Sequence, residues 1–275
     1  MAFVNKLAII AGGVGGIGSA TGRVLRSEGA KLALLYAPFE AQRVSSVIKQ
    51  TYTDFDNDDD SIKTYACDIT QPESVKEAFG KIGEDRVAVP NMLINSAGYV
   101  NLMSMSSLTP EDTLLHYNIN VLGPLLCAQA FHALYTEHRA LMLSAIASGQ
   151  LSSSRKISGA RIVNIASQAG HVALKDHGAY CASKAALLAL TRQMASEWGS
   201  EGVTANSISP GPVWTELGKK AWADAKAREE YQAAVPTGNF AEPDEVAEIV
   251  AFLCKESSKN INGADVRLDG GYTVR

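Results

Sequence analysis

A tyrosine and a lysine four positions apart, Tyr180 and Lys184, are the residues of this chain best placed to do chemistry. If both lie on one helix, their spacing puts them on the same face. A protonated lysine beside a phenol favours the phenolate and lowers the pKa of the tyrosine. Tyr180 would then exchange a proton with a substrate oxygen near neutral pH. Chance also puts Tyr and Lys on one helix face, but of the nine tyrosines only Tyr180 has Lys at this spacing.

The elements predicted around this pair bring a third side chain, Ser167, to the same place. Residues 178–198 are rich in alanine and leucine, which predicts one long helix carrying both Tyr180 and Lys184. Residues 161–166 (RIVNIA) predict a buried strand that ends just before Ser167. Parallel sheets bind ligands at the carboxyl ends of their strands, so Ser167 is expected at a binding edge. The wide apolar face of the helix favours packing on another subunit, hence a homo-oligomer (dimer or tetramer).

A glycine-rich turn near the amino terminus predicts a dinucleotide-binding loop. Residues 7–11 (LAIIA) form a short apolar run typical of a buried parallel strand, and helical spacing begins after the glycines. Between them, Gly12, Gly16 and Gly18 have the spacing GxxxGxG. Glycines allow the tight turn and let backbone N–H groups approach a pyrophosphate at the positive end of the helix.

The tip of the second predicted strand, residues 31–36, bears on the choice of cofactor. An Asp or Glu there would hydrogen-bond a ribose 2′-OH and repel a 2′-phosphate. The chain has Tyr36, Ala37 and Pro38 instead, with no acid and no adjacent arginine. This favours NADP(H) over NAD(H). Arg43 is the nearest cation, and a solvated surface charge is the simpler interpretation of it.

Seven predicted strands alternate with helices, which indicates an α/β fold with a Rossmann-like, doubly wound parallel sheet and helices on both faces. We expect a single domain over residues 1–275, with a helical flap at about 213–236 and surface insertions at about 53–61 and 141–159. Besides the three strands above, the apolar runs that predict strands are 62–67, 91–95, 203–209 and 264–269.

Two polar residues have both a functional and a structural interpretation. Asn120 lies inside a predicted helical region, where asparagine competes for backbone hydrogen bonds. Gly123 and Pro124 just beyond it predict a kink that frees backbone groups, and a buried structural amide is the alternative. Asp68, at the end of the third strand, either faces an adenine edge or caps the next helix through an Asx turn.

Composition and charge exclude several classes of function. A net charge of −4 and a pI of about 5.8 leave no basic surface for nucleic acid or for an anionic membrane. The four cysteines are far apart and the five histidines form no metal-binding motif, which fits reduced thiols and gives no support for a metal site. The sequence has no apolar run long enough to span a membrane and no cleavage signature. A cytoplasmic location is the default expectation.

The order of the motifs resembles the compact type of short-chain dehydrogenase/reductase over nearly the whole chain. Any one of these motifs occurs by chance, whereas all of them in order at the family's spacings do not. The motifs are AGGVGGIG (11–18), Asp68, NSAG (95–98), Asn120, Ser167, YCASK (180–184) and PGPVWT (210–215).

This resemblance implies a catalytic tetrad and a set of cofactor contacts. Tyr180 would be the proton donor or acceptor, Ser167 would orient the substrate oxygen, and Lys184 would lower the Tyr180 pKa and bind the nicotinamide ribose. Asn120 would hold a water that continues the proton relay. The implied cofactor contacts are Gly12, Gly16, Ile17 and Gly18 at the pyrophosphate; Tyr36 and Ala37 at the strand tip; Asp68 and Ile69 at the adenine; Asn95, Ala97 and Gly98 at the adenosine ribose; and Pro210, Gly211, Val213 and Thr215 at the nicotinamide.

The chain departs from the family pattern at a few positions. Ala11 replaces a threonine that helps to fix the glycine loop, Ser96 replaces the second Asn of NNAG, and Ala166 replaces the first Ser of a pair. The Tyr36-Ala37 tip resembles NADPH-preferring ketoreductases of the fungal type, although Pro38 follows where those have a small hydroxyl residue nearby.

We therefore expect an NADP(H)-dependent reductase of a ketone or aldehyde, reversible to a secondary alcohol. The alternatives are an NAD-dependent polyol or hydroxysteroid-type dehydrogenase and, from another class, a non-catalytic cofactor-sensing or scaffold protein. The sequence does not rank sugars, steroids, acyl thioesters and xenobiotic ketones as substrates. Residues that line a substrate pocket, or else pack in an ordinary way, are Tyr99, Gln168, His171, Trp214 and Trp222.

Overall fold

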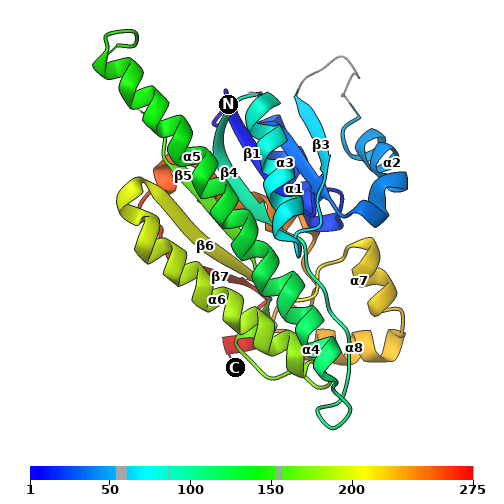
Figure 1. Cartoon of the computed structure of the whole chain (residues 1–275). Helices are drawn as coiled ribbons and strands as arrows, with labels where there is room; N and C mark the ends of the chain where they lie inside the picture. The colour runs from blue at the N-terminus through cyan, green and yellow to red at the C-terminus, as the bar shows by residue number, and fades with distance from the viewer. Residues whose placement is uncertain (54–60, 86, 153, 155–156, 275) are drawn as a thin grey trace.

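The computed structural model of the chain describes residues 1–53, 61–85, 87–152, 154 and 157–274. They form one twisted sheet with helices packed against both of its faces (Figure 1). The insertion predicted at 53–61 lies, except for its two end residues, outside the described residues.

Among the described residues, the sheet has seven strands that all pair in parallel, in the order β3-β2-β1-β4-β5-β6-β7. This confirms the predicted Rossmann-like α/β fold, because the order reverses direction at β1 and β4 as in doubly wound sheets. The strands are β1 (Lys6–Ala11), β2 (Lys31–Tyr36), β3 (Ile62–Ala66), β4 (Val89–Asn95), β5 (Ala160–Ile165), β6 (Val203–Pro210) and β7 (Asp265–Leu268).

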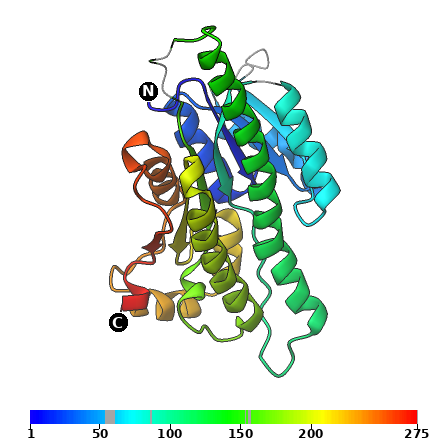
Figure 2. The ribbon, with the colours of Figure 1, turned by 60° about the vertical axis from the view of Figure 1, so that its left-hand side comes forward.

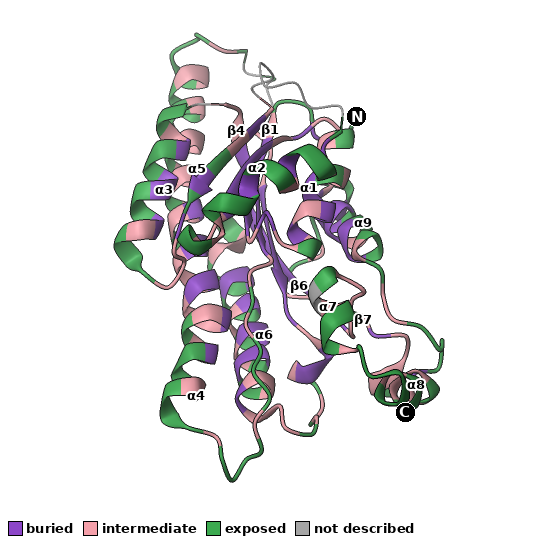
Figure 3. Ribbon diagram, turned by 90° about the vertical axis from the view of Figure 1, so that its right-hand side faces the viewer, coloured by how far each residue is buried: buried purple, intermediate pink, exposed green. Residues whose placement is uncertain are grey.

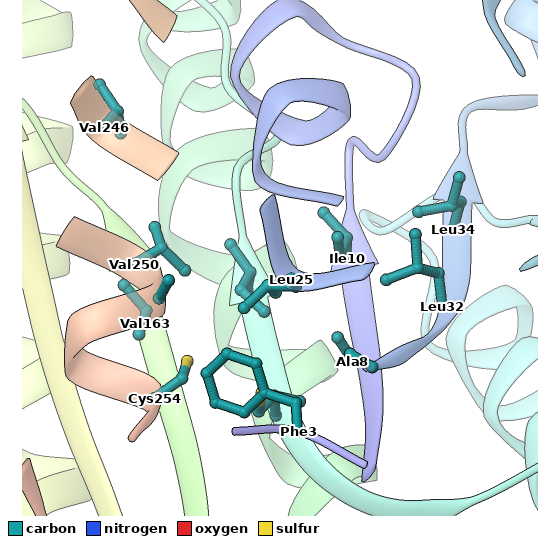
Figure 4. Close-up of a cluster of buried hydrophobic side chains, with 14 of the residues drawn as sticks. Phe3, Ala8, Ile10, Leu25, Leu32, Leu34, Val163, Val246, Val250 and Cys254 are labelled. Atoms are coloured by element: carbon teal, nitrogen blue, oxygen red, sulfur yellow. The ribbon is translucent and has the colours of Figure 1, made fainter. Parts of the chain in front are cut away.

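Alternation of side chains along the strands gives the sheet two separate cores. In β1, Ala8 and Ile10 point to one core, whereas Leu7 and Ile9 point to the other. Figure 4 shows the first core, where Phe3 lies among the side chains of β1 and of the helices above it. Fully burying a side chain of the size of Ile or Leu stabilises a fold by roughly 1.5–3 kcal/mol, so both helical layers are held firmly to the strands.

Helices α1, α2 and α9 cover one face of the sheet, and α3, α5 and α6 cover the other (Figures 2 and 3). The predicted helix at 178–198 is observed with those bounds, and the predicted flap consists of two short helices, α7 and α8. The helices are α1 (Gly16–Ser27), α2 (Ala41–Thr51), α3 (Pro72–Asp85), α4 (Pro110–Tyr117), α5 (Gly123–Ala147), α6 (Gly178–Trp198), α7 (Glu216–Ala221), α8 (Ala225–Ala234) and α9 (Pro243–Cys254).

Between α4 and α5 the chain makes a π-helical turn, Asn118–Leu122, at the place where the sequence predicts a kink. Pro124 at the start of α5 has no N–H to donate to the carbonyl four residues before it, which is the carbonyl of Asn120. α5 then continues to Ala147, so the predicted insertion at 141–159 begins as the last turns of this helix.

The segments that carry most of the predicted site residues leave the sheet at the carboxyl ends of β1, β4, β5 and β6. Because these four strands are parallel and adjacent in the sheet, the four segments meet at one edge. In the described part of the chain, no helix combines the length and the apolar character needed to cross a membrane.

Candidate active site

The structure brings Ser167, Tyr180 and Lys184 together at the carboxyl end of β5. Tyr180 and Lys184 lie on the first two turns of α6, and the Lys184 Nζ is 5.7 Å from the centre of the Tyr180 ring. The Ser167 side chain lies near enough to Tyr180 for its hydroxyl to favour the phenolate, and its Oγ accepts the N–H of Ala169 at 3.1 Å. The Lys184 Nζ donates to the carbonyl of Ile165 at 2.9 Å. A phenol, a hydroxyl and an amine therefore converge at the predicted edge.

Burial decides the pKa values of this group. It raises the pKa of Tyr180, and the hydrogen bond from Ser167 offsets this only in part. Burial also lowers the pKa of Lys184, to about 8. The lowering of the Tyr180 pKa that we expected from Lys184 is therefore not found. The physical reason is that the amine is itself desolvated and is directed at the Ile165 carbonyl.

Asn120 is fully buried in the π-helical turn, close to this group. Its Nδ2 donates to the carbonyl of Tyr99 at 2.8 Å and to Ser183 Oγ at 3.0 Å, and its Oδ1 accepts the N–H of Tyr99 at 2.8 Å. Both amide hydrogens are used, so the side chain fixes the loop after β4. A Cβ on Gly98 would lie 3.6 Å from both Asn120 Oδ1 and Lys184 Nζ.

The glycine loop has the geometry that a bound pyrophosphate requires. Gly12 has a φ of +77°, and a Cβ there would lie 2.8 Å from the backbone nitrogen of Ala97. A Cβ on Gly18 would collide with the carbonyl of Gly12. α1 starts at Gly16 with no side-chain cap and no acid in its first turn. No side-chain cap therefore satisfies its first N–H groups, and the positive end of the helix attracts an anion.

The loop after β6 closes over the glycine loop. A Cβ on Gly16 would lie 2.5 Å from Thr215 Cγ2. Thr215 also caps α7 by accepting the N–H of Gly218 at 3.0 Å. Gly211 donates its N–H to Leu268 at 3.0 Å, which holds the start of this loop against β7. The predicted pyrophosphate and nicotinamide contacts are thus adjacent, and the residues present fit a dinucleotide cofactor.

The predicted adenosine contacts are less uniform. Asp68 Oδ1 accepts hydrogen bonds from the N–H and the hydroxyl of Thr70, at 3.0 and 2.7 Å. The predicted Asx turn is therefore formed through this one carboxylate oxygen. The Asn95 side chain is buried between β4 and β5, where it donates to Asn164 Oδ1 at 2.8 Å. It therefore supports the sheet, and only its backbone lies toward the loop. Ser96 retains an anchoring role because its Oγ donates to the Ala11 carbonyl at 2.7 Å.

The five candidate pocket residues separate into three groups. Tyr99 packs near Tyr180 through a histidine between them. His171 is held elsewhere, because its Nε2 lies 2.8 Å from Asp265 Oδ2 and 3.2 Å from Ser209 Oγ. The remaining residues belong to an aromatic cluster formed by the flap and residues outside it, in which Gln168 Nε2 donates to the Tyr231 hydroxyl at 2.7 Å. Its rings include those of Trp214, Trp222, Tyr231 and Phe240.

The histidine between Tyr99 and Tyr180 is His116, which the sequence reasoning missed. Its ring is fully buried and lies 4.8 Å from the Tyr99 ring and 6.3 Å from the Tyr180 ring. His116 Nε2 accepts the N–H of Asn101 at 3.1 Å, which holds the loop after β4 a second time. The sequence did contain one signal for it: His116 is four residues before Asn120, a spacing that puts two helical residues on the same face.

In the described part of the chain, no group of three or more His, Cys, Asp or Glu side chains is arranged to hold a metal ion. The candidate site places the half-buried phenol of Tyr180 beside the amine of Lys184.

Comparison with known proteins agrees with this geometry. The family described as Enoyl-(Acyl carrier protein) reductase matches residues 12–273. D-threitol dehydrogenase from Mycolicibacterium smegmatis is 35% identical over 271 residues, covering 98% of this chain and 94% of that protein. NAD-dependent glycerol dehydrogenase from Listeria innocua is 32% identical over 271 residues, covering 98% and 95%. A short-chain dehydrogenase/reductase from Serratia marcescens superposes with a TM-score of 0.81 at 25% identity, covering 99% of this chain and 100% of that one.

A family match over nearly the whole chain and relatives above 30% identity at full coverage show the same family by independent routes. The chain therefore belongs to the short-chain dehydrogenase/reductase family, whose members are oxidoreductases that act on alcohol and carbonyl groups.

Proposed function

We propose that the protein interconverts a secondary alcohol and a ketone on a small polyol or sugar-like substrate, using a nicotinamide cofactor. The observation that carries this proposal is the convergence of Ser167, Tyr180 and Lys184 beside the glycine loop. The names of the two relatives above, a threitol dehydrogenase and a glycerol dehydrogenase, support the substrate class.

In this proposal Tyr180 exchanges the proton. During reduction its hydroxyl donates a proton to the carbonyl oxygen, and during oxidation its phenolate accepts the proton of the alcohol. Ser167, which lies next to Tyr180, orients the substrate oxygen. Lys184 lies behind the ring and returns or removes the proton, because its pKa of about 8 is close to neutral. The nicotinamide, when bound, supplies or accepts the hydride.

Asn120 is the fourth member of the proposed tetrad. Its side chain positions the loop after β4, and its backbone carbonyl, four residues before Pro124, is available to a water that links Lys184 to solvent. This modifies the role expected from the resemblance, in which the residue as a whole holds the water.

The residues that would hold the cofactor are those of the glycine loop and of the strand ends and loops around it. The first turn of α1 would hold the pyrophosphate, the loop after β6 the nicotinamide, and the tip of β2 the adenosine ribose. The residues proposed are Gly12, Gly16, Ile17, Gly18, Tyr36, Ala37, Asp68, Ile69, Asn95, Ala97, Gly98, Lys184, Pro210, Gly211, Val213 and Thr215.

Two cofactor choices have separate support. The absence of an acid at Tyr36 and Ala37 supports NADP(H). The name of the NAD-dependent glycerol dehydrogenase supports NAD(H) and the polyol alternative. The expected cytoplasmic location and the expected homo-oligomer stay predictions.

Substitution of Tyr180 by Phe tests the proposal. It removes one hydroxyl, so we expect turnover of polyols and ketoses to fall by about 10³-fold or more, with cofactor binding within about twofold of the parent by fluorescence titration. Tyr65→Phe is the matched control. Tyr65 lies on β3 and its hydroxyl donates to Asp85 on α3, away from Ser167, Tyr180 and Lys184. Near-normal turnover in Tyr180→Phe would refute the proposal. Tight cofactor binding with no turnover of any polyol, sugar or ketone by the parent would favour the non-catalytic alternative.

A further inference from the structure

The segment after β2 returns an acid to the strand tip that the sequence leaves without one. Pro38–Glu40 form a single 3-10 turn, and Glu40 Oε2 accepts the N–H of Ala37 at 3.1 Å. The Glu40 side chain is only 16% exposed, so its carboxylate is packed against the tip and does not extend into solvent. An acid three residues beyond the tip in sequence therefore lies at the tip in space.

Arg43 connects this acid to the glycine loop. Its Nη1 lies 3.5 Å from Glu40 Oε1, and its Nη2 donates to the carbonyl of Val14 at 3.3 Å. Val14 lies between Gly12 and Gly16, so the pair Glu40–Arg43 spans the gap between the two loops that flank an adenosine ribose in this fold. The guanidinium is thus held by two acceptors of this chain.

We propose that Glu40 acts as the ribose-binding acid of this chain and that the Glu40–Arg43 pair makes the enzyme prefer NAD(H) to NADP(H). This inference rests on the proposed function, because it assigns the cofactor of the same site. It also replaces the NADP(H) preference expected from Tyr36 and Ala37, since the missing acid is supplied from the 3-10 turn.

The charges decide between the two cofactors. A ribose 2′-OH is a donor, and a carboxylate with one oxygen already fixed by a backbone N–H is a suitable acceptor for it. A 2′-phosphate carries up to two negative charges and meets the same carboxylate with repulsion. Arg43 neutralises such a phosphate only by leaving Glu40 and the Val14 carbonyl, and either loss has a cost.

Binding of two nucleotide fragments tests the inference without turnover. 5′-AMP and 2′,5′-ADP differ only in the 2′-phosphate, and their dissociation constants are measured on the parent and on Glu40→Gln by calorimetry. We expect the parent to bind 5′-AMP more tightly than 2′,5′-ADP. The glutamine keeps an oxygen for the Ala37 N–H, so we expect the ratio of the two constants to shift toward 2′,5′-ADP by about 10-fold or more on loss of the charge.

Two further variants isolate the pair. Glu245→Gln removes the same charge from the same local arrangement, because Glu245 Oε2 accepts the N–H of Glu242 at the start of α9; we expect no shift in the ratio. In Glu40→Gln/Arg43→Ala the gain for 2′,5′-ADP should disappear, which would show that the freed guanidinium takes the phosphate.

Each outcome has a definite meaning. Tighter binding of 2′,5′-ADP by the parent, or an unchanged ratio in Glu40→Gln, would overturn the assignment of Glu40 while leaving the proposed reaction intact. Failure of the parent to bind either fragment, or full activity of Tyr180→Phe, would overturn the proposed function itself. If the ratio of the two dissociation constants shifted equally in Glu245→Gln, the effect would come from net charge alone, and the assignment of Glu40 would again be overturned.

Discussion

Gly16 and Thr215, far apart in sequence, touch across the cofactor cradle. Only the absence of a side chain at Gly16 allows it, since a Cβ there would lie 2.5 Å from Thr215 Cγ2 and 2.7 Å from Thr215 Cβ. Thr215 is not free to retreat, because it is β-branched and its hydroxyl caps α7. The glycine loop and the flap are therefore fitted to each other before any cofactor binds.

This contact predicts the effect of Gly16→Ala. The methyl group must displace Thr215 and the start of α7, so we expect affinity for the dinucleotide to fall by about 10- to 100-fold (about 1.4–2.8 kcal/mol), measured by fluorescence titration. Gly80→Ala is the control: Gly80 is on α3, nothing lies within 4 Å of its added Cβ, and the change should stabilise the fold by about 0.5–1 kcal/mol. Unchanged dinucleotide affinity in Gly16→Ala would contradict the assignment of this cradle.

The burial of Lys184 predicts a gain in stability when its charge is removed. Its pKa is lowered from 10.5 to about 8, so the folded state binds the proton less well than the unfolded state does. The penalty is complete below pH 8, falls as pH rises from 8 to 10.5, and is absent above that. We expect Lys184→Met to raise the free energy of unfolding at pH 7 by up to about 3 kcal/mol, less about 1 kcal/mol for the lost bond to Ile165.

Urea unfolding of the parent and of Lys184→Met at pH 7 and pH 9.5 provides the measurement. The difference between the two proteins should be largest at pH 7 and smaller at pH 9.5. The same variant should have little or no turnover. A lysine-to-methionine change that destabilises the fold equally at both pH values would show that the amine carries no burial penalty.

The raised pKa of Tyr180 predicts opposite pH dependences for the two directions of the reaction. Carbonyl reduction needs the protonated phenol, which predominates at neutral pH, so we expect its rate to be highest there and to fall in alkaline solution. Alcohol oxidation needs a proton acceptor, so we expect its rate to rise through pH 8, where Lys184 also loses its proton. Initial rates from pH 6 to 10 in both directions test this, and parallel profiles would exclude Tyr180 as the exchanging group.

The sequence was a good guide wherever the signal is local. Apolar runs and glycine turns predicted the strands and the glycine loop, and the helix of Tyr180 and Lys184 was predicted with its observed bounds. The parallel order and the common edge followed from the alternation of strands and helices.

Features that depend on tertiary contacts were not accessible in this way. The return of Glu40 to the Ala37 amide is set by a 3-10 turn whose sequence, Pro-Phe-Glu, does not specify where its side chain points. The pKa of Tyr180 depends on how far its hydroxyl is removed from water, which spacing along a helix does not report. His171 is similar: it follows Ser167 closely in sequence, yet it bonds Asp265 on β7.

The π-helical turn at Asn118–Leu122 makes the register between α4 and α5 a fixed property of the chain. Each helical residue advances the chain by about 100° around the helix axis. Removal of one residue from this turn would rotate Asn120 away from the Tyr99 backbone and carry the buried face of α4 around with it. This segment therefore tolerates exchange of side chains far better than a change in length, and the spacing between His116 and Pro124 matters to the candidate site as much as the residues within it.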